Sequence, residues 1–135
     1  MLLPKKTKYR KAFRGKMRGL AQKGNKLILG DWGVQALSRG LLSSRQIEAA
    51  RKSVMHYTER GGKLLIRVFP DKPISKKPAE TRMGGGKSAV DHYAAVVRPG
   101  RIIFEVAGLP KEMAQEALKL ASAKLPLKVR IVKKQ

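Results

Sequence analysis

An excess of positive charge constrains this chain more than any other feature of its sequence. Lys and Arg number 31 against 9 Asp and Glu, which gives a formal net charge of +22 over 135 residues. Mutual repulsion of this size opposes compaction and calls for a polyanionic partner, with nucleic acid favoured over an anionic membrane. Hydrophobic residues still make up 42% of the chain, which is typical of globular proteins. We therefore expect one folded core with a basic exterior.

Missing residue types exclude several classes of function. The chain has no cysteine and only two histidines, so it has no disulfides, no Cys-based zinc site and no thiol nucleophile. Neither His56 nor His92 stands in a recognisable metal-binding or catalytic spacing. We expect no catalytic residue, no metal, no cofactor and no small-molecule substrate, and hence no enzymatic activity.

No stretch of the sequence predicts membrane insertion or export. The apolar runs are only about four or five residues long, too short to span a bilayer. The start of the chain, Met1–Lys6, has no apolar signal region. We expect a protein of the bacterial cytoplasm, or of an organelle stroma if it is plastid-encoded.

The first 26 residues are predicted to form an extended basic arm. Residues 1–30 hold ten Lys or Arg, and the first acidic residue is Asp31. Scattered glycines and the absence of any apolar period mean that this segment cannot bury enough surface to order itself, so we expect it to order against phosphates. A disordered solubilising tail is the alternative, but Tyr9 and Phe13 interleave with the cations. The candidate phosphate-binding residues here are Lys5, Lys6, Lys8, Arg10, Lys11, Arg14, Lys16 and Arg18.

Residues 27–135 are predicted to form one globular domain that begins with strands and a helix. Short strands are expected over 26–30 and 33–39. Ser43 followed by Gln46 fits a capping box that starts a helix, and Gly61–Gly62 is expected to end it. Alternation of apolar residues predicts a strand over 63–69.

The second half of the domain predicts a hairpin and a second helix. Pro99–Gly100 suits a type II turn, which we expect to join strands 92–98 and 101–106 into a hairpin. An apolar stripe with Pro110 in its first turn predicts a helix over 110–125, and a last strand is expected over 127–132. The fold class is therefore α+β, a mostly antiparallel sheet with two amphipathic helices packed on one face.

A glycine-rich loop over 78–90 is the most distinctive motif. Gly86-Lys87-Ser88 imitates the end of a nucleotide-binding P-loop, but Thr81 stands where that motif needs glycine. We therefore expect no nucleotide hydrolysis. Three consecutive glycines between Arg82 and Lys87 instead allow the backbone to approach a charged partner closely, and two strands bracket the loop. A flexible tip with incidental charge is the alternative.

Read in order, seven motifs resemble the bacterial and organellar large-subunit ribosomal protein sixteen family over essentially the whole chain. The motifs are Pro4–Lys11, Gly15–Gly19, Ser44–Arg51, Gly61–Lys63, Ile66–Pro73, Lys77–Gly84 and Pro99–Arg101. The sequence departs from the family after the glycine loop, where Ser88 replaces a glycine and Asp91-His92-Tyr93 replaces an acid followed by Tyr and Trp. A lost glycine narrows the backbone conformations open at Ser88.

The resemblance implies a structural constituent of the large ribosomal subunit that helps position tRNA. It implies binding to large-subunit (23S-type) rRNA by the arm cations, to which we add Arg45 and Arg51 of the first helix. It also implies contact with A-site tRNA, leaving P-site contact open, through Arg82, Met83, Gly84, Gly85, Gly86 and Lys87. Some relatives hydroxylate the arginine that corresponds to Arg82. Neighbouring large-subunit ribosomal proteins are the other implied partners.

Two other functions compete with the ribosomal one. A general nucleic-acid-compacting protein would bind DNA as well as RNA, but no helix shows a groove-reading stripe and no dimerisation heptad is present. An RNA-modifying enzyme would need a cofactor pocket or a catalytic constellation, which the sequence does not contain.

Overall fold

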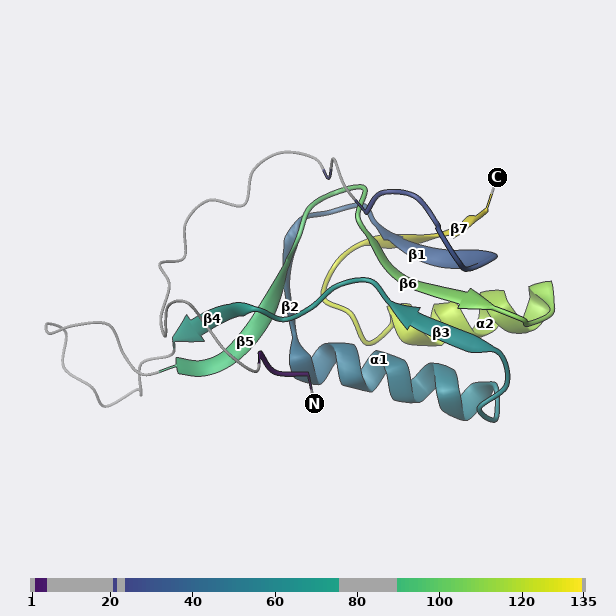
Figure 1. Ribbon diagram of the computed structural model, residues 1–135, viewed down its shortest axis with the longest axis horizontal. Coiled ribbons are helices and arrows are strands. Elements are labelled where there is room, and N and C mark those ends of the chain that lie inside the picture. Colours follow the sequence, from purple (N-terminus) through teal and green to yellow (C-terminus); the bar gives the residue numbers. More distant parts are fainter. Residues whose placement is uncertain (1, 5–20, 22–23, 76–89, 135) are drawn as a thin grey trace, which may run out of the picture.

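The structure is a computed structural model that describes residues 2–4, 21, 24–75 and 90–134 (Figure 1). These residues form seven strands and two helices. In chain order they are β1 (Trp32–Ala36), β2 (Gly40–Ser43), α1 (Ser44–Tyr57), β3 (Lys63–Ile66), β4 (Lys72–Ser75), β5 (Val90–Val97), β6 (Ile102–Ala107), α2 (Lys111–Ser122) and β7 (Val129–Lys133).

The strands form two antiparallel sheets instead of the one sheet that the sequence predicted. One sheet has the order β3-β6-β1-β7 and the other the order β2-β5-β4. The α+β class and the antiparallel pairing are confirmed. Helix α1 contacts β2 and β5, helix α2 contacts β1 and β7, and the two helices contact each other. The helices therefore close the core against both sheets.

The predicted hairpin is wrong, although its turn is right. Gly100 has a φ of 98° and the N–H of Arg101 donates to the carbonyl of Arg98 at 3.1 Å, as the proposed turn requires. Strand β5 nevertheless pairs with β2 and β4, whereas β6 pairs with β1 and β3. The backbone N–H of Gly100 donates to the carbonyl of Ala36 at 2.8 Å, so the turn packs on the end of β1. Strands β5 and β6 thus diverge into different sheets after the turn.

Helix α1 begins where the capping box predicted. The Gln46 N–H donates to Ser43 Oγ at 3.2 Å, and the Ser43 N–H donates to Gln46 Oε1 at 3.0 Å. Ile47, Ala50 and Val54 are buried on its inner face. These bonds and this apolar face confirm the predicted helix.

The end of α1 differs from the prediction. The helix ends at Tyr57, and the left-handed backbone is adopted first by Glu59 and Arg60, with φ values of 53° and 65°. Gly62 also has a positive φ, of 70°, and a Cβ there would lie 2.7 Å from the carbonyl oxygen of Ala107. Glycine is therefore required at Gly62 by close approach to β6, after the helix has already ended.

Helix α2 is shorter than predicted and keeps its apolar stripe. It covers Lys111–Ser122, with Pro110 just before it. Ala114, Ala117, Leu118 and Ala121 are buried, as the stripe predicted. Small residues on this face let α2 pack closely on α1 and β1.

Several strand boundaries shift from their predicted positions. The expected strand over 33–39 is β1, which ends at Ala36 because the chain then passes to the other sheet, where β2 begins at Gly40. Strand β3 ends at Ile66 instead of continuing to residue 69, and the last strand covers Val129–Lys133. Residues 70–90, predicted to be irregular, include β4 and the start of β5. Residues 26–30 do not form the expected strand.

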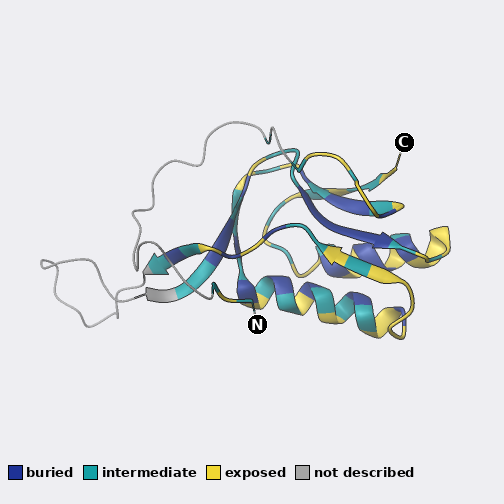
Figure 2. Cartoon of the chain, in the orientation of Figure 1, coloured by how far each residue is buried: buried dark blue, intermediate teal, exposed yellow. Residues whose placement is uncertain are grey.

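The core lies between the helices and the two sheets. Figure 2 shows buried residues concentrated on β1, β6 and the inward faces of both helices. Val34, Leu42, Ile47, Phe104 and Leu118 are among its fully buried side chains. The sheets and helices therefore bury one continuous cluster, which supplies the main stabilising term of the fold.

Replacing Ser43 by Ala should lower the free energy of unfolding by about 1 kcal/mol, because the backbone N–H of Gln46 in the first turn of α1 loses its bond to Ser43 Oγ. Urea titration of the full-length chain measures the change. Ser53→Ala is the matched control, since the Ser53 hydroxyl only donates to the Ala50 carbonyl within the same helix, at 2.9 Å. Equal effects of the two substitutions would contradict the role of the cap.

Candidate nucleic-acid interface

The segment before β1 is held by a buried carboxylate, and this explains why residues 26–30 do not form a strand. Glu105 of β6 is only 1% exposed. Its Oε1 accepts backbone N–H bonds from Ile28 at 2.8 Å, Leu29 at 3.2 Å and Gly30 at 3.0 Å. A strand would direct these consecutive N–H groups alternately to opposite sides, so their convergence on one oxygen excludes a strand here.

Arg67 completes the environment of this carboxylate. Its Nη1 donates to Glu105 Oε2 at 2.8 Å and to the backbone carbonyl of Lys26 at 2.7 Å. The Arg67 side chain is 12% exposed and that of Glu105 is 0% exposed, so the pair is largely removed from water. One arginine thus joins the buried acid, the sheet and the chain segment that leads into β1.

Burial and hydrogen bonding act in opposite directions on the pKa of Glu105. Burial raises the pKa because it disfavours the charged form, while bonds from Gly30 and Ile28 and the Arg67 guanidinium lower it. The net effect is a pKa below the ordinary value of 4.5. Glu105 therefore stays ionised and holds the segment at neutral pH.

Further bonds attach the described part of the predicted arm to the fold. The Ala21 N–H donates to the Pro99 carbonyl at 2.9 Å, and the Ile102 N–H donates to the Gly24 carbonyl at 2.7 Å. Gly24 has a φ of 68°, and a Cβ there would lie 2.7 Å from the Arg101 guanidinium. Arg101 Nη2 in turn donates to the Arg67 carbonyl at 2.8 Å. We call residues 24–30 the arm root.

Most residues of the predicted binding sites lie outside the described part of the chain. This is true of the arm cations Lys5, Lys6, Lys8, Arg10, Lys11, Arg14, Lys16 and Arg18, and of the loop residues Arg82, Met83, Gly84, Gly85, Gly86 and Lys87. The strands that bracket the loop are described. Strands β4 and β5 are antiparallel neighbours with Ser75 opposite Val90, so the last described residue before the loop and the first after it lie side by side at one end of a sheet.

The two predicted binding residues on α1 differ in their environment. Arg45 is exposed at the start of the helix. Arg51 instead forms an ion pair with Glu48, and its Nε donates to Glu48 Oε1 at 3.1 Å. The hydrogen bond between them raises the pKa of Arg51 and lowers that of Glu48. Arg45 is therefore the better placed of the two to meet a phosphate.

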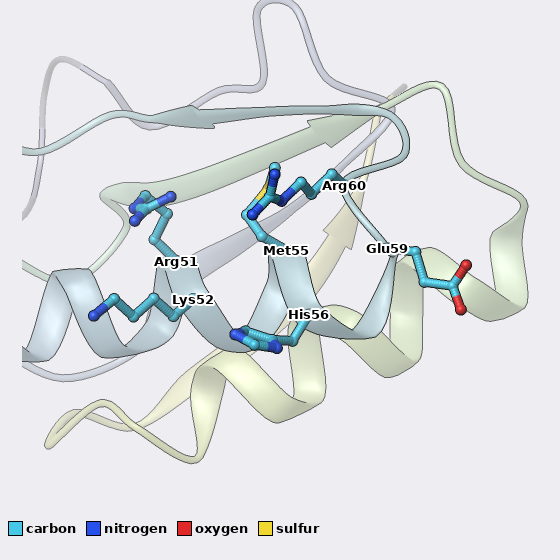
Figure 3. Close-up of a pocket in the computed structure, with 6 residues that line it drawn as sticks. All are labelled: Arg51, Lys52, Met55, His56, Glu59 and Arg60. Carbon is cyan, nitrogen blue, oxygen red and sulfur yellow. The ribbon is translucent and has the colours of Figure 1, made fainter.

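A pocket beside the second half of α1 brings Arg51, a predicted rRNA-binding residue, together with Lys52 and Arg60, which the sequence did not single out. It encloses about 500 Å³ and is lined by Arg51, Lys52, Met55, His56, Glu59 and Arg60 (Figure 3). The Glu59 carboxylate points away from the other side chains in that view. Spacing of four residues from Lys52 to His56 to Arg60 was the available signal. We call this the α1 pocket.

Two kinds of feature were not found among the described residues, a metal-binding cluster and a membrane-spanning helix. Within the described ranges, no group of three or more His, Cys, Asp or Glu side chains is arranged to hold a metal ion. No helix formed by these residues is long and apolar enough to cross a membrane. The described surface is basic at Arg45 and at the α1 pocket, among other places.

Comparison with known proteins decides the family. A family model described as ribosomal protein L16p/L10e matches residues 4–132. The chain is also 55% identical over 132 residues to the large ribosomal subunit protein uL16c of Porphyra purpurea, covering 98% of this chain and 95% of that protein. The chain belongs to the ribosomal protein L16p/L10e family.

The L16p/L10e match includes both segments that carry the predicted binding residues. Residues 4–132 contain every arm cation from Lys5 to Arg18 and the whole glycine-rich loop. The resemblance noted from seven short motifs is thus confirmed over nearly the full length of the chain. This is a family of ribosomal proteins and not a family of enzymes.

Replacing Glu105 by Gln should lower the free energy of unfolding by about 3–5 kcal/mol, because Arg67 is left as a buried charge without its partner. Urea denaturation at neutral pH measures this. The control is Glu48→Gln, which breaks the ion pair on the surface of α1 and should cost at most about 1 kcal/mol. A Glu105→Gln protein as stable as the Glu48→Gln protein would contradict the anchoring role of this carboxylate.

The same substitution has a defined pH signature. Because the folded-state pKa of Glu105 is lowered, its contribution to stability is complete above the ordinary value of 4.5 and is lost as the pH falls through the folded-state value. The stability difference between the wild type and Glu105→Gln should be constant from pH 7 to about 5 and shrink below 4.5. A difference that does not change on acidification would contradict an ionised Glu105.

Proposed function

We propose that this chain is a structural constituent of the large ribosomal subunit that binds 23S-type rRNA and contacts A-site tRNA. One observation carries the proposal: the match to the L16p/L10e family model over residues 4–132 in a chain with a net charge of +22. The relative from Porphyra purpurea is named as a large-subunit protein, which supports the same assembly for this chain. Its place is then in the ribosome, in the bacterial cytoplasm or an organelle stroma.

The arm is proposed to supply most of the affinity for rRNA. Its cations neutralise phosphates and release counterions, which makes binding strong, largely independent of base sequence and sensitive to salt. Arg45 extends this contact onto α1, and Arg51 adds to it while sharing its charge with Glu48. Attachment of residues 21 and 24–30 to the sheet supports this role, because it fixes where the arm leaves the globular body.

The glycine-rich loop is proposed to meet tRNA. Antiparallel β4 and β5 give it a firm base at one end of a sheet. Gly84, Gly85 and Gly86 allow close approach to a backbone, while Arg82 and Lys87 supply charge for phosphates. Contact with the P-site tRNA is part of this proposal, as is Arg82 as the position of a hydroxylated arginine.

The proposed function is to bind and position RNA, and it requires no chemical reaction. Phosphate recognition by Lys and Arg needs no cofactor and no metal, so the proposal assigns the chain no catalytic residue and no small-molecule substrate. Its partners are large-subunit rRNA, tRNA and neighbouring large-subunit ribosomal proteins. The alternative is a nucleic-acid-compacting protein without ribosomal specificity, which a comparison of rRNA with other nucleic acids distinguishes from the ribosomal role.

Binding to a large-subunit rRNA transcript should weaken steeply with salt but remain selective. About eight engaged phosphates predict a slope of log affinity against log salt of about −6 to −7. Filter binding across a salt series measures the slope, with DNA duplex and unrelated RNA of equal length as competitors. Equal affinity for all three nucleic acids at every salt concentration would favour the compacting protein and contradict the ribosomal role.

Replacing Arg82 by Ala should leave rRNA binding intact and weaken A-site tRNA binding by about tenfold or more, as expected when a charge-assisted hydrogen bond worth about 1.5–3 kcal/mol is lost. The measurement is tRNA affinity in ribosomes that carry the variant. Two controls accompany it: Arg82→Lys keeps the charge, and Lys119→Ala removes a charge from the exposed face of α2. Unchanged tRNA affinity with Arg82→Ala would overturn the assignment of the loop.

A further inference from the structure

A second pocket lies on the other side of the molecule from the α1 pocket, where the arm root meets the last strand. It encloses about 500 Å³. Figure 1 shows the loop before β1 running beside β7 near the C-terminal end of the chain, away from α1. We call it the β7 pocket. It is lined by Asn25, Lys26, Leu27, Gln35, Ile102, Arg130, Val132, Lys133 and Lys134.

Every charged residue that lines the β7 pocket is basic. Lys26 comes from the arm root, and Arg130, Lys133 and Lys134 come from β7 and the residue after it. The Lys133 ammonium is placed over the Trp32 ring, 5.9 Å from its centroid, so it is engaged elsewhere. Lys26, Arg130 and Lys134 then remain, all exposed. None of the three belongs to an ion pair among the described residues.

Gln35 fixes the arginine of this pocket. Its Nε2 donates to the carbonyl of Gly100 at 2.9 Å and to that of Asn25 at 3.4 Å. These bonds set the amide orientation and present Gln35 Oε1 to Arg130, whose Nε donates to it at 2.9 Å. The two terminal nitrogens of the guanidinium are left to form a fork, the geometry that matches a phosphate.

The hydrogen-bond partner of Arg130 differs in charge from the partners of Arg51 and Arg67. Arg51 and Arg67 are held by carboxylates, which compensate their charge. Arg130 is held by a neutral amide, which orients the guanidinium and leaves its full positive charge available. Orientation without neutralisation is what an anion-binding arginine requires, since less side-chain entropy is then lost on binding.

We propose that the β7 pocket binds a phosphate of the RNA backbone, with the Arg130 guanidinium as the oriented donor and Lys26 and Lys134 as flanking charges. The proposal rests on the proposed function, since it takes the polyanion to be RNA. Gln35 is a positioning residue that acts through Arg130. Because Asn25 and Lys26 belong to the arm root, a phosphate bound here ties the RNA to the junction of arm and sheet.

Removing the charge of the pocket tests the proposal through the salt dependence of binding. Arg130→Gln together with Lys134→Gln, in the full-length chain, should lower the magnitude of the log–log slope for a large-subunit rRNA transcript by about 1.5. The control removes the same charge from the last turn of α2 and the turn that follows it, by Lys119→Gln with Lys124→Gln, and should change the slope by less than about 0.5. Equal changes in the two double variants would overturn the proposal.

Two variants that preserve the net charge distinguish a phosphate site with defined geometry from non-specific electrostatic attraction. Arg130→Lys preserves the charge and loses the fork, and Gln35→Leu preserves all charges and releases Arg130. Both should weaken rRNA binding several-fold with an unchanged slope, while circular dichroism confirms the fold. Wild-type affinity in both would overturn the assigned geometry.

The outcomes also separate this inference from the proposed function. If the wild type prefers the rRNA transcript over DNA but the pocket variants behave like the α2 control, the pocket assignment fails and the ribosomal role stands. If the wild type shows no preference, the ribosomal role fails whatever the variants do. If the pocket variants bind rRNA normally but lose contact with an acidic segment of a neighbouring protein in assembled subunits, the occupant is protein and the RNA assignment is wrong.

Discussion

The ionised carboxylate of Glu105 fixes the position of the arm root, the segment that leads into β1. A carboxylate that is almost fully buried is costly unless it is paired and fully hydrogen-bonded, and here three backbone N–H groups and Arg67 meet that requirement. The groups that satisfy it come from the arm root and from the residue just after β3, so the acid joins segments distant in sequence. The arm root therefore has a defined place on the sheet, although its sequence offers too little apolar surface for the segment to become ordered alone.

The arginines of the folded body fall into two groups, those whose charge a carboxylate compensates and those whose charge is available for binding. Carboxylates compensate Arg51 and Arg67, which fix a helix surface and the arm root. The neutral Gln35 holds Arg130 and leaves its charge uncompensated. The chain has a net charge of +22 and therefore few carboxylates. Which arginines these carboxylates neutralise decides where uncompensated positive charge lies on the surface. The antiparallel β4–β5 pair belongs to one sheet, while the arm root is bonded to β6 of the other sheet.

The sequence predicted local structure better than pairing. The capping box at Ser43 and the apolar stripe of α2 are encoded within a few residues, and both helices were correctly predicted. The Pro99–Gly100 turn was also correct, but a turn sequence does not specify the partners of its flanking strands, and β5 and β6 belong to different sheets. Residues 26–30 were wrongly predicted as a strand because their partner is a side chain 75 to 77 positions away. For the same reason the β7 pocket was missed: Gln35 and Arg130 are 95 residues apart. The arm and loop residues are still predictions, because they lie outside the described part of the chain.

Ultraviolet crosslinking of the full-length protein in cells tests the central claim most directly. The attached nucleic acid is sequenced and the crosslinked peptides are mapped. We predict reads concentrated in one region of large-subunit rRNA, with tRNA attached through peptides that contain Arg82 to Lys87. Reads scattered over many RNAs, or recovery of DNA, would contradict it and would mean that charge alone determines what this protein binds.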